Sequence, residues 1–272
     1  MKIAFIGGGN MASALIAGLA GKLTDGANIH VVDPNAEQLA RLKASYGVGA
    51  ARQIDAAVGA SDVIVLAVKP QQMREVAAAL LPQLQGARPL LLSIAAGVRG
   101  ADLARWLGGY GAIVRTMPNT PALIGQGITG MVAMDGVSAA QKQAADDIMR
   151  AVGATVWLED EAMIDPVTAV SGSGPAYVFY FIEAMQQAAQ ELGLSAEQGK
   201  QLALATFTGA AQLAAQSPDD VAVLRERVTS KGGTTYAALT SMEQSGVKQA
   251  IVDAVKAASA RGRELGEQLG GD

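Results

Sequence analysis

Two glycine-rich stretches hold residue types that suit ligand binding, and the first lies at the start of the chain. There the apolar run KIAFI leads into a turn formed by Gly7, Gly8, Gly9, Asn10, Met11 and Ala12. The spacing matches G-x-G-x-x-G/A, with alanine in the third place. We expect Gly7 to make a tight turn, Gly9 to let a pyrophosphate approach the backbone, and Ala12 to let the following helix pack closely. A purely structural turn is the alternative.

An acidic residue follows at the distance that a dinucleotide site requires. The next strand-like run, IHVVD, ends at Asp33, near the position where a carboxylate binds the ribose hydroxyls of NAD. Its charge would repel the additional phosphate of NADP. Asn35 and Arg41 come shortly after, and either could turn toward such a phosphate. The residues therefore leave the choice between NADP and NAD open.

The second glycine-rich stretch, VTSKGGTTYAALTSMEQSG, begins at Val228. Gly232 and Gly233 expose backbone N–H groups at the start of a predicted helix, which suits a carboxylate. Thr234 and Thr235 offer hydrogen-bond donors without charge. We expect a binding site for a small anionic substrate that has one further polar atom. The alternative is an ordinary helix cap after a loop.

Three further loops follow strand-like runs. Lys69 and Pro70 follow DVIVLAV, SIAAGV ends another run, and RTMPNTPALIGQGITG contains Asn119 between two prolines. Ligands of an open α/β sheet bind at the carboxyl ends of its strands, so these loops should face the nicotinamide side of the cofactor. Ordinary turns between strands and helices are the alternative for each loop.

The elements that must position these residues divide the chain in two. From Met1 to about Asp160, strand-like runs alternate with helical patterns. These runs are KIAFIG, IHVVD, DVIVLAV, RPLLLSIAAG, AIVRTM and ATVWLE. Such apolar strands, separated by helices, indicate a parallel sheet covered on both faces. The sequence predicts an α/β fold with a Rossmann-like doubly wound sheet over residues 1–160.

The remaining residues, 161–272, show helical patterns only. These patterns are DPVTAVSGSGPAYVFYFIEAMQQAAQELG, SAEQGKQLALATFTGAAQLAAQ, DDVAVLRERV and VKQAIVDAVKAASARGRELGEQL. We expect an all-α domain that delivers the substrate. Its segment PAYVFYFIEAM is apolar around most of its circumference, which is too much for a helix with one solvated face. An obligate dimer or a larger ring is therefore expected, with a second chain covering this helix.

Several function classes are disfavoured by composition. The chain of 272 residues contains no cysteine and one histidine, His30, which opens the second strand-like run. We expect no metal site, and a reaction that needs little acid–base chemistry from side chains, such as hydride transfer from a cofactor. The formal net charge of −4 and scattered basic residues argue against nucleic acid. No run resembles a signal peptide or a membrane span, so a cytoplasmic protein is expected.

Six motifs in order give the chain a clear resemblance. These are FIGGGNMASALIAGL, AVKPQ, SIAAGV, MPNTPALIGQG, VSGSGPAYVF and VTSKGGTTYAALTSME. With them, the sequence resembles the pyrroline-5-carboxylate reductase family over its whole length. The resemblance implies NADPH- or NADH-dependent reduction of 1-pyrroline-5-carboxylate to L-proline, the last step of proline biosynthesis. It also implies an all-α dimerisation domain and a homodimer, which in larger rings reaches a decamer.

The resemblance also assigns roles to residues. Thr235 would hydrogen-bond the ring nitrogen of the substrate, and the backbone from Gly232 to Thr234 would hold its carboxylate. Asp33 departs from the pattern, because many NADPH-preferring relatives have a neutral or basic residue there. The cofactor would be bound by Gly7, Gly8, Gly9, Asn10, Met11, Ala12, Asp33, Asn35, Ala67, Val68, Lys69, Pro70, Ala95, Ala96, Gly97 and Asn119.

Two other functions fit part of the pattern. A 3-hydroxyacid dehydrogenase shares the two-domain plan, but its family carries a lysine a few residues into the helix after a glycine-rich turn. SGSGPAYVFYF has no lysine there. A dinucleotide-sensing module without turnover would bind cofactor and leave the threonine pair without a purpose. Oxidation of NADPH or NADH that depends on substrate distinguishes these alternatives.

Overall fold

The computed structural model describes residues 1–84, 86 and 88–271, which form two compact units. The first unit contains Met1–Ser173 and the C-terminal segment from Ala257 onward, and the second contains Gly174–Lys256. The first holds all the strands that the structure describes, and the described part of the second holds only helices and loops. The change from alternating elements to helices is therefore confirmed.

The sheet of the first unit has the strand order β3-β2-β1-β4-β5-β6-β7-β8 among the described residues. Neighbouring strands are parallel except β6 and β7, which are antiparallel. Order and direction match a doubly wound sheet with an added edge. The strands are β1 (Ile3–Ile6), β2 (Ile29–Val32), β3 (Gly49–Ala51), β4 (Val63–Leu66), β5 (Leu90–Ser93), β6 (Ile113–Met117), β7 (Gly127–Ala133) and β8 (Gly153–Trp157).

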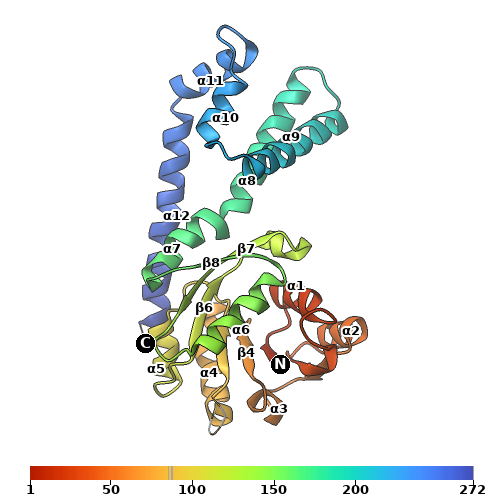
Figure 1. Ribbon diagram of the computed structural model, residues 1–272, viewed down its shortest axis with the longest axis vertical. Coiled ribbons are helices and arrows are strands. Elements are labelled where there is room, and N and C mark those ends of the chain that lie inside the picture. Colours follow the sequence, from red (N-terminus) through yellow and green to blue (C-terminus); the bar gives the residue numbers. More distant parts are fainter. Residues whose placement is uncertain (85, 87, 272) are drawn as a thin grey trace. The chain divides into compact units, whose positions relative to one another are not determined.

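The helices of this unit flank the sheet (Figure 1), and α2, α3 and α6 begin at side-chain caps. They are α1 (Asn10–Leu19), α2 (Ala36–Tyr46), α3 (Ala56–Gly59), α4 (Met73–Leu80), α5 (Gly100–Trp106), α6 (Ala139–Arg150) and α7 (Ile164–Val167). The side chain of Asn35 accepts hydrogen bonds from the first turn of α2, and Gly47 ends that helix with φ of 68°. Ser138 and Gln141 form a capping box at α6.

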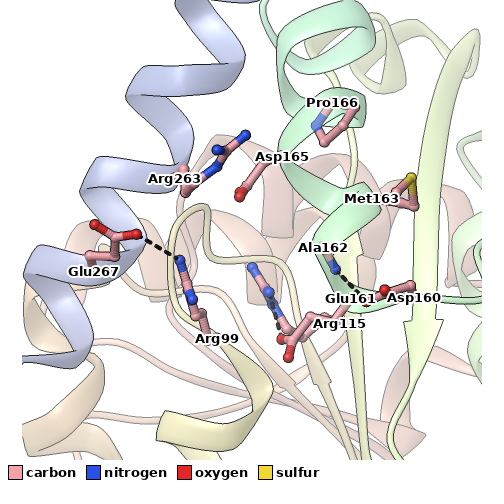
Figure 2. A pocket seen from close by; sticks show the side chains of 10 residues that line it. All are labelled: Arg99, Arg115, Asp160, Glu161, Ala162, Met163, Asp165, Pro166, Arg263 and Glu267. Atoms are coloured by element: carbon pink, nitrogen blue, oxygen red, sulfur yellow. Dashed lines mark hydrogen bonds and ion pairs between the residues drawn. The ribbon is translucent and has the colours of Figure 1, made fainter.

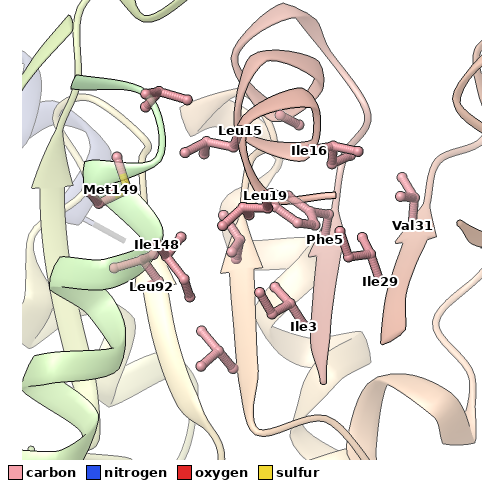
Figure 3. Close-up of a cluster of buried hydrophobic side chains, with 14 of the residues drawn as sticks. Ile3, Phe5, Leu15, Ile16, Leu19, Ile29, Val31, Leu92, Ile148 and Met149 are labelled. Atoms are coloured by element: carbon pink, nitrogen blue, oxygen red, sulfur yellow. The ribbon is translucent and has the colours of Figure 1, made fainter. Parts of the chain in front are cut away.

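Alternate strand residues fill two separate cores. On one face, Ile3, Phe5 and Leu92 pack with side chains from α1 and α6, as Figure 3 shows. On the other face, Ile6, Leu66 and their neighbours pack against α4 and α5. This alternation follows from the period of two along a strand. It explains why the runs contain no polar face, and it confirms the predicted fold class.

Two strands were not predicted. Strand β3 consists of Gly49, Ala50 and Ala51, which carry no β-branched or aromatic side chain. Strand β7 begins within RTMPNTPALIGQGITG, the stretch that was expected to be a loop after the preceding strand. It returns antiparallel to β6 after a short helical turn, Thr120–Ile124, and thereby carries β8 as the sheet edge. The predicted doubly wound sheet is confirmed as mainly parallel, and β6 and β7 add one antiparallel pair that was not predicted.

The second unit contains α8 (Gly174–Glu191), α9 (Ala196–Gln216), α10 (Val221–Arg227), α11 (Thr234–Gln244) and the first part of α12 (Val247–Gly270). Helices α8 and α9 pack closely where a Cβ on Gly199 would lie 3.0 Å from the Cβ of Ala189. Among the described residues, no helix is long and apolar enough to cross a membrane.

The compact units divide later than the predicted domain boundary after residue 160. Helix α7 packs on the sheet, since a Cβ on Gly130 would lie 2.6 Å from Cγ1 of Val167. The end of α12 also returns to the first unit, where Leu269 packs against the α4–α5 core. The domains at residues 1–160 and 161–272 stay a prediction.

Candidate functional site

A cavity of about 910 Å³ opens at the carboxyl ends of β1, β2, β3 and β4, all within the first unit. The strand order reverses between β1 and β4, which is where open α/β sheets bind ligands. The cavity is lined by Ile6, Gly7, Gly9, Val32, Asp33, Pro34, Asn35, Arg52, Gln53, Ile54, Ala67, Val68, Lys69, Gln72, Glu75, Val76 and Ala79.

The glycines of the first turn serve different purposes. Gly7 has φ of 99°, and a Cβ there would lie 2.6 Å from the carbonyl oxygen of Ala67, so the fold itself requires glycine. A Cβ on Gly9 would meet no atom within 4 Å. Gly9 is the N-cap of α1, and no side chain caps this helix, which leaves its first N–H groups available. The open space and these donors fit a pyrophosphate.

Side chains hold the peptide groups around Gly8. The N–H of Gly8 donates to Oδ2 of Asp33 at 2.7 Å, and the N–H of Asn35 donates to Oδ1 at 2.8 Å. Ser13 Oγ donates to the carbonyl oxygen of Gly8 at 3.2 Å, and the amide of Gln38 donates to the same oxygen. Asp33 therefore fixes the glycine turn in addition to lining the cavity. From the sequence, Asp33 was predicted only to bind the ribose hydroxyls of the cofactor.

Seven of the sixteen predicted cofactor residues line this cavity. They are Gly7, Gly9, Asp33, Asn35, Ala67, Val68 and Lys69. Pro70 begins the adjacent 3-10 turn, Pro70–Gln72. Asn10 is exposed, whereas Met11 packs against the core and Ala12 is 1% exposed. The structure thus gives Ala12 the packing position that the motif requires.

The predicted residues of two other loops do not line this cavity. Gly97 has φ of 77°, and a Cβ there would lie 3.0 Å from Cδ1 of Leu269 near the end of α12, while Ala95 is buried. The Asn119 amide donates to the carbonyl oxygen of Ser171 at 3.2 Å and accepts from the N–H of Ile128 at 3.0 Å. Residues distant in the sequence hold both loops, through packing at Gly97 and through a hydrogen bond to Ser171 at Asn119. Contacts of Ala95, Ala96, Gly97 and Asn119 with cofactor stay predictions.

The residues on the other side of the cavity were not predicted from the sequence. Arg52, Gln53 and Ile54 follow β3, and Gln72, Glu75, Val76 and Ala79 lie on the turn before α4 or on α4 itself. The residues after β3 could have been found only if GAA had been recognised as a strand. The sequence indicated a helix at α4, but its apolar pattern does not indicate which face lines a ligand site.

The second glycine-rich stretch lies in the second unit. Gly232 has φ of 75°, the N–H of Gly233 donates to the carbonyl oxygen of Ser230 at 3.0 Å, and Gly233 is the N-cap of α11. No side chain caps this helix, so Thr234 and Thr235 do not act as caps. Their N–H groups lie in the first turn, where a helix has no internal partners for them.

A different cavity, of about 450 Å³, is lined by three arginines and four acidic residues (Figure 2). Buried Arg115 pairs with Glu161, with 2.6 Å between Nη1 and Oε1, and the same oxygen accepts from the N–H of Gly100 at 2.5 Å. Arg99 and Glu267 approach to 3.9 Å. This mixed cluster fastens the segment after β8 to the sheet, and it has no excess of positive charge for an anion.

His30 plays no part in either cavity. Its Nε2 lies 3.1 Å from Oδ1 of Asp55, the N-cap of α3. No cluster of three possible metal ligands exists among the described residues.

The sheet order, the glycine turn and the cavity define an oxidoreductase-type dinucleotide-binding unit joined to a helical unit. Residues 161–265 match the family described as pyrroline-5-carboxylate reductase dimerisation, and residues 2–97 match the family described as NADP oxidoreductase coenzyme F420-dependent. The chain is 49% identical to the pyrroline-5-carboxylate reductase of Pseudomonas aeruginosa, over 99% of this chain and 98% of that protein. The chain belongs to the pyrroline-5-carboxylate reductase family.

Solved structures agree with this assignment. A pyrroline-5-carboxylate reductase from Coxiella burnetii is 40% identical, with a TM-score of 0.92 over 97% of this chain and 98% of that one. A pyrroline carboxylate reductase from Plasmodium falciparum, solved with NADP bound, is 31% identical, with a TM-score of 0.87 over 98% of both chains.

Proposed function

We propose that this chain is an NAD(P)H-dependent oxidoreductase that reduces the imine of 1-pyrroline-5-carboxylate to L-proline, the last step of proline biosynthesis. The observation that carries the proposal is the 49% identity, over nearly the whole chain, to a curated enzyme with this name. The cavity beside Gly9 supplies an independent physical argument, since it offers space and helix N–H donors for the cofactor. The expected cytoplasmic location depends on this biosynthetic role.

The first unit would bind the cofactor. Gly9 and the first turn of α1 would contact its pyrophosphate, with Gly7 and Gly8 shaping the turn. Ala67, Val68 and Lys69 follow β4 on the opposite wall of the cavity. Asp33 and Asn35 would face the adenosine ribose, which would bring the nicotinamide toward the loops that contain Ala95–Gly97 and Asn119. The bound cofactor would supply the hydride.

The second unit would bind the substrate. The N–H groups at the start of α11 would hold its carboxylate, because they lack partners within the helix and lie at the positive end of its dipole. Thr235 would orient the ring nitrogen through its hydroxyl. A cyclic imine protonated from solvent is already electrophilic, so the reaction needs placement more than a strong protein acid.

The chain would act as a homo-oligomer. Residues 161–265 match a dimerisation family, and α8 exposes large apolar side chains, with Tyr180 71% exposed and Phe179 59% exposed. We infer a homodimer in which the helical region of one chain completes the site of the other. Assembly of dimers into a larger ring, such as a decamer, is the further step of this proposal.

A 3-hydroxyacid dehydrogenase is the competing activity. It would need a lysine near the start of the helix after the glycine-rich turn, and α8 contains none from Gly174 to Glu191. A cofactor-sensing module is the other alternative, and it would leave the free N–H groups of α11 unexplained.

The test supplies 1-pyrroline-5-carboxylate with NADPH or NADH deuterated at the transferred position. We expect oxidation of the cofactor that depends on substrate, and L-proline that contains one deuterium at the former imine carbon. 3-Hydroxybutyrate with NADP or NAD serves as the control for the competing activity. Cofactor binding without substrate-dependent oxidation would overturn the proposal in favour of a sensing module.

A further inference from the structure

One side chain of the cofactor cavity has a charge that the proposed chemistry does not use. Arg52 follows β3 and lines the cavity together with Asp33 and Asn35. Its position is fixed by the sheet, because Ala51 pairs with Val32 and its carbonyl oxygen accepts from the N–H of Asp33 at 3.1 Å. Arg52 is therefore the first residue after β3, next to the backbone hydrogen bond between Ala51 and Asp33. It is exposed, and no described acidic group lies within ion-pair distance of it.

The carboxylate of Asp33 is less of an obstacle to a phosphate than its charge suggests. Each of its oxygens already accepts a backbone N–H, from Gly8 and from Asn35. These bonds stabilise the charge and direct both oxygens toward the chain. The oxygen of the Asn35 side chain is likewise occupied, since it caps α2 at 3.0 and 3.2 Å, and no described group accepts from its amide nitrogen. Two donor groups, from Arg52 and Asn35, thus remain at this edge of the cavity.

We propose that Arg52, assisted by the amide of Asn35, binds the 2′-phosphate of the adenosine ribose and makes NADPH the preferred cofactor. This inference rests on the proposed function, which brings the ribose to Asp33. A guanidinium offers several N–H donors in a planar fork that matches phosphate oxygens. Lys69 adds a second positive charge to the cavity, while Glu75 on α4 opposes it. Arg41, the basic residue suggested by the sequence, lies on α2 and does not line the cavity.

Binding of adenosine 2′,5′-bisphosphate and of 5′-AMP tests the site without turnover. Isothermal titration of the full chain should show tighter binding of the bisphosphate. Arg52→Gln should weaken it by about 10- to 100-fold, the range for a charge-assisted hydrogen bond, and should change 5′-AMP by less than about threefold. Arg41→Gln removes the same charge from an exposed position outside the cavity and should change neither affinity. Arg52→Lys keeps the charge without the fork and should fall between wild type and Arg52→Gln.

The ratio of kcat/KM for NADPH to that for NADH gives a second measurement, and it should fall in Arg52→Gln by the same factor. Equal weakening of both nucleotides, or an effect of Arg41→Gln as large as that of Arg52→Gln, would overturn the assignment. If the chain reduces 1-pyrroline-5-carboxylate but Arg52→Gln leaves the discrimination between NADPH and NADH unchanged, the inference is overturned and the proposed function stands. If the chain shows no reductase turnover but Arg52→Gln loses the preference for adenosine 2′,5′-bisphosphate over 5′-AMP, the inference is supported and the proposed function is overturned.

Discussion

The two units differ in how they bury apolar side chains. In Met1–Ser173 the strands are covered on both faces, and Ile3, Phe5 and Leu92 are fully buried. In Gly174–Lys256 the buried large apolar residue is Ile182, whereas Phe179 and Tyr180 on the same helix are more than half exposed. The first unit satisfies the hydrophobic effect with its own residues, and the second leaves apolar area in water. This difference indicates that the second unit completes its core with another chain.

A groove in the second unit supports this interpretation. The groove has a volume of about 320 Å³ and lies between α8 and the start of α12. Its lining is almost wholly apolar and includes Tyr180, Phe181, Ile251 and Val255. Tyr177 also lines it, and its hydroxyl is buried without a described hydrogen-bond partner. Buried hydroxyls normally have a partner, so this group is expected to find one in the assembled protein.

The largest effect should come from a charge in this groove. Tyr180→Glu places a carboxylate where a second chain is expected to cover the helix, and burying an unpaired charge costs several kcal/mol. We expect loss of the dimer and a fall in reductase activity of about 100-fold or more. Sedimentation at assay concentration and steady-state kinetics measure both effects.

Gln190→Glu on the same helix provides the control, because it adds the same charge at an exposed polar position. It should remain dimeric and active. A monodisperse, fully active monomer of Tyr180→Glu would show that the second unit needs no partner.

A change in the first unit should separate stability from assembly. Glu161→Ala leaves the guanidinium of Arg115, whose side chain is 6% exposed, without its carboxylate, and removes the acceptor for the N–H of Gly100. Loss of one member of such a pair costs about 3 kcal/mol, which corresponds to a Tm lowered by roughly 6 to 12 °C.

The oligomeric state of this variant should not change, which is the reverse of the result expected for Tyr180→Glu. Exposed Glu159→Ala is the matched control and should alter Tm little. An unchanged Tm for Glu161→Ala would mean that water replaces the pair without cost.

A smaller effect on activity is expected at the proposed substrate site. Thr235→Ala removes one hydroxyl near the start of α11, and a hydrogen bond to a charged partner contributes about 1.5 to 3 kcal/mol, so kcat/KM should fall by roughly 10- to 100-fold. Cofactor affinity should stay constant, and Thr235→Ser should retain most of the activity. Normal turnover combined with a lowered Tm would assign the threonine to helix stability instead.

The smallest effect should arise at Asp146, which links α6 to β8. Burial raises the pKa of this carboxyl, but hydrogen bonds from Arg150, Thr155 and Trp157, together with the charge of Arg150, outweigh burial and lower the pKa below its ordinary value. A lowered folded-state pKa stabilises the protein above the unfolded pKa of about 4, and this contribution is lost as the pH falls through the folded value.

Asp146→Asn should therefore lower Tm by a few degrees near neutral pH, as expected for about 1 kcal/mol. The difference from wild type should shrink as the pH falls from about 4 through the lower folded-state pKa, because the unfolded carboxyl binds a proton first and the folded carboxyl follows. Exposed Asp135→Asn serves as the control. A Tm difference that is constant across this pH range would mean that shape, and not charge, matters at residue 146.

The sequence predicted what local patterns encode and missed what distant elements create. The apolar runs predicted six of the strands and the doubly wound sheet, because burial on both faces leaves a continuous apolar pattern. The glycine spacing predicted that Gly7 and Gly9 lie at the cofactor cavity. Strand β3 was not predicted because Gly49, Ala50 and Ala51 pair with β2 through backbone groups alone, without a side-chain pattern. Arg52 follows this strand and was therefore not predicted to line the cavity.

Asp33 illustrates a second limit of sequence patterns. Its distance from the glycines indicated the cavity, but the hydrogen bond from the N–H of Gly8 depends on how two loops meet. The Asn119 loop shows the same limit, because its partners at Ile128 and Ser171 come from β7 and from the turn before α8. Such contacts depend on the assembled sheet and on no single segment.

We propose that the first unit binds the cofactor and that the second binds the substrate for another chain. Two defective chains test this proposal most directly. Gly9→Glu should block the pyrophosphate without disturbing the fold, since a Cβ there meets no atom within 4 Å. Thr235→Glu should repel the anionic substrate. Each variant alone should be inactive. Co-expressed chains should pair at random, so about half of the dimers contain one chain of each kind. Each mixed dimer then has one intact site of two, and the mixture should regain about a quarter of wild-type activity. No activity in the mixture above that of the separate variants would contradict this account.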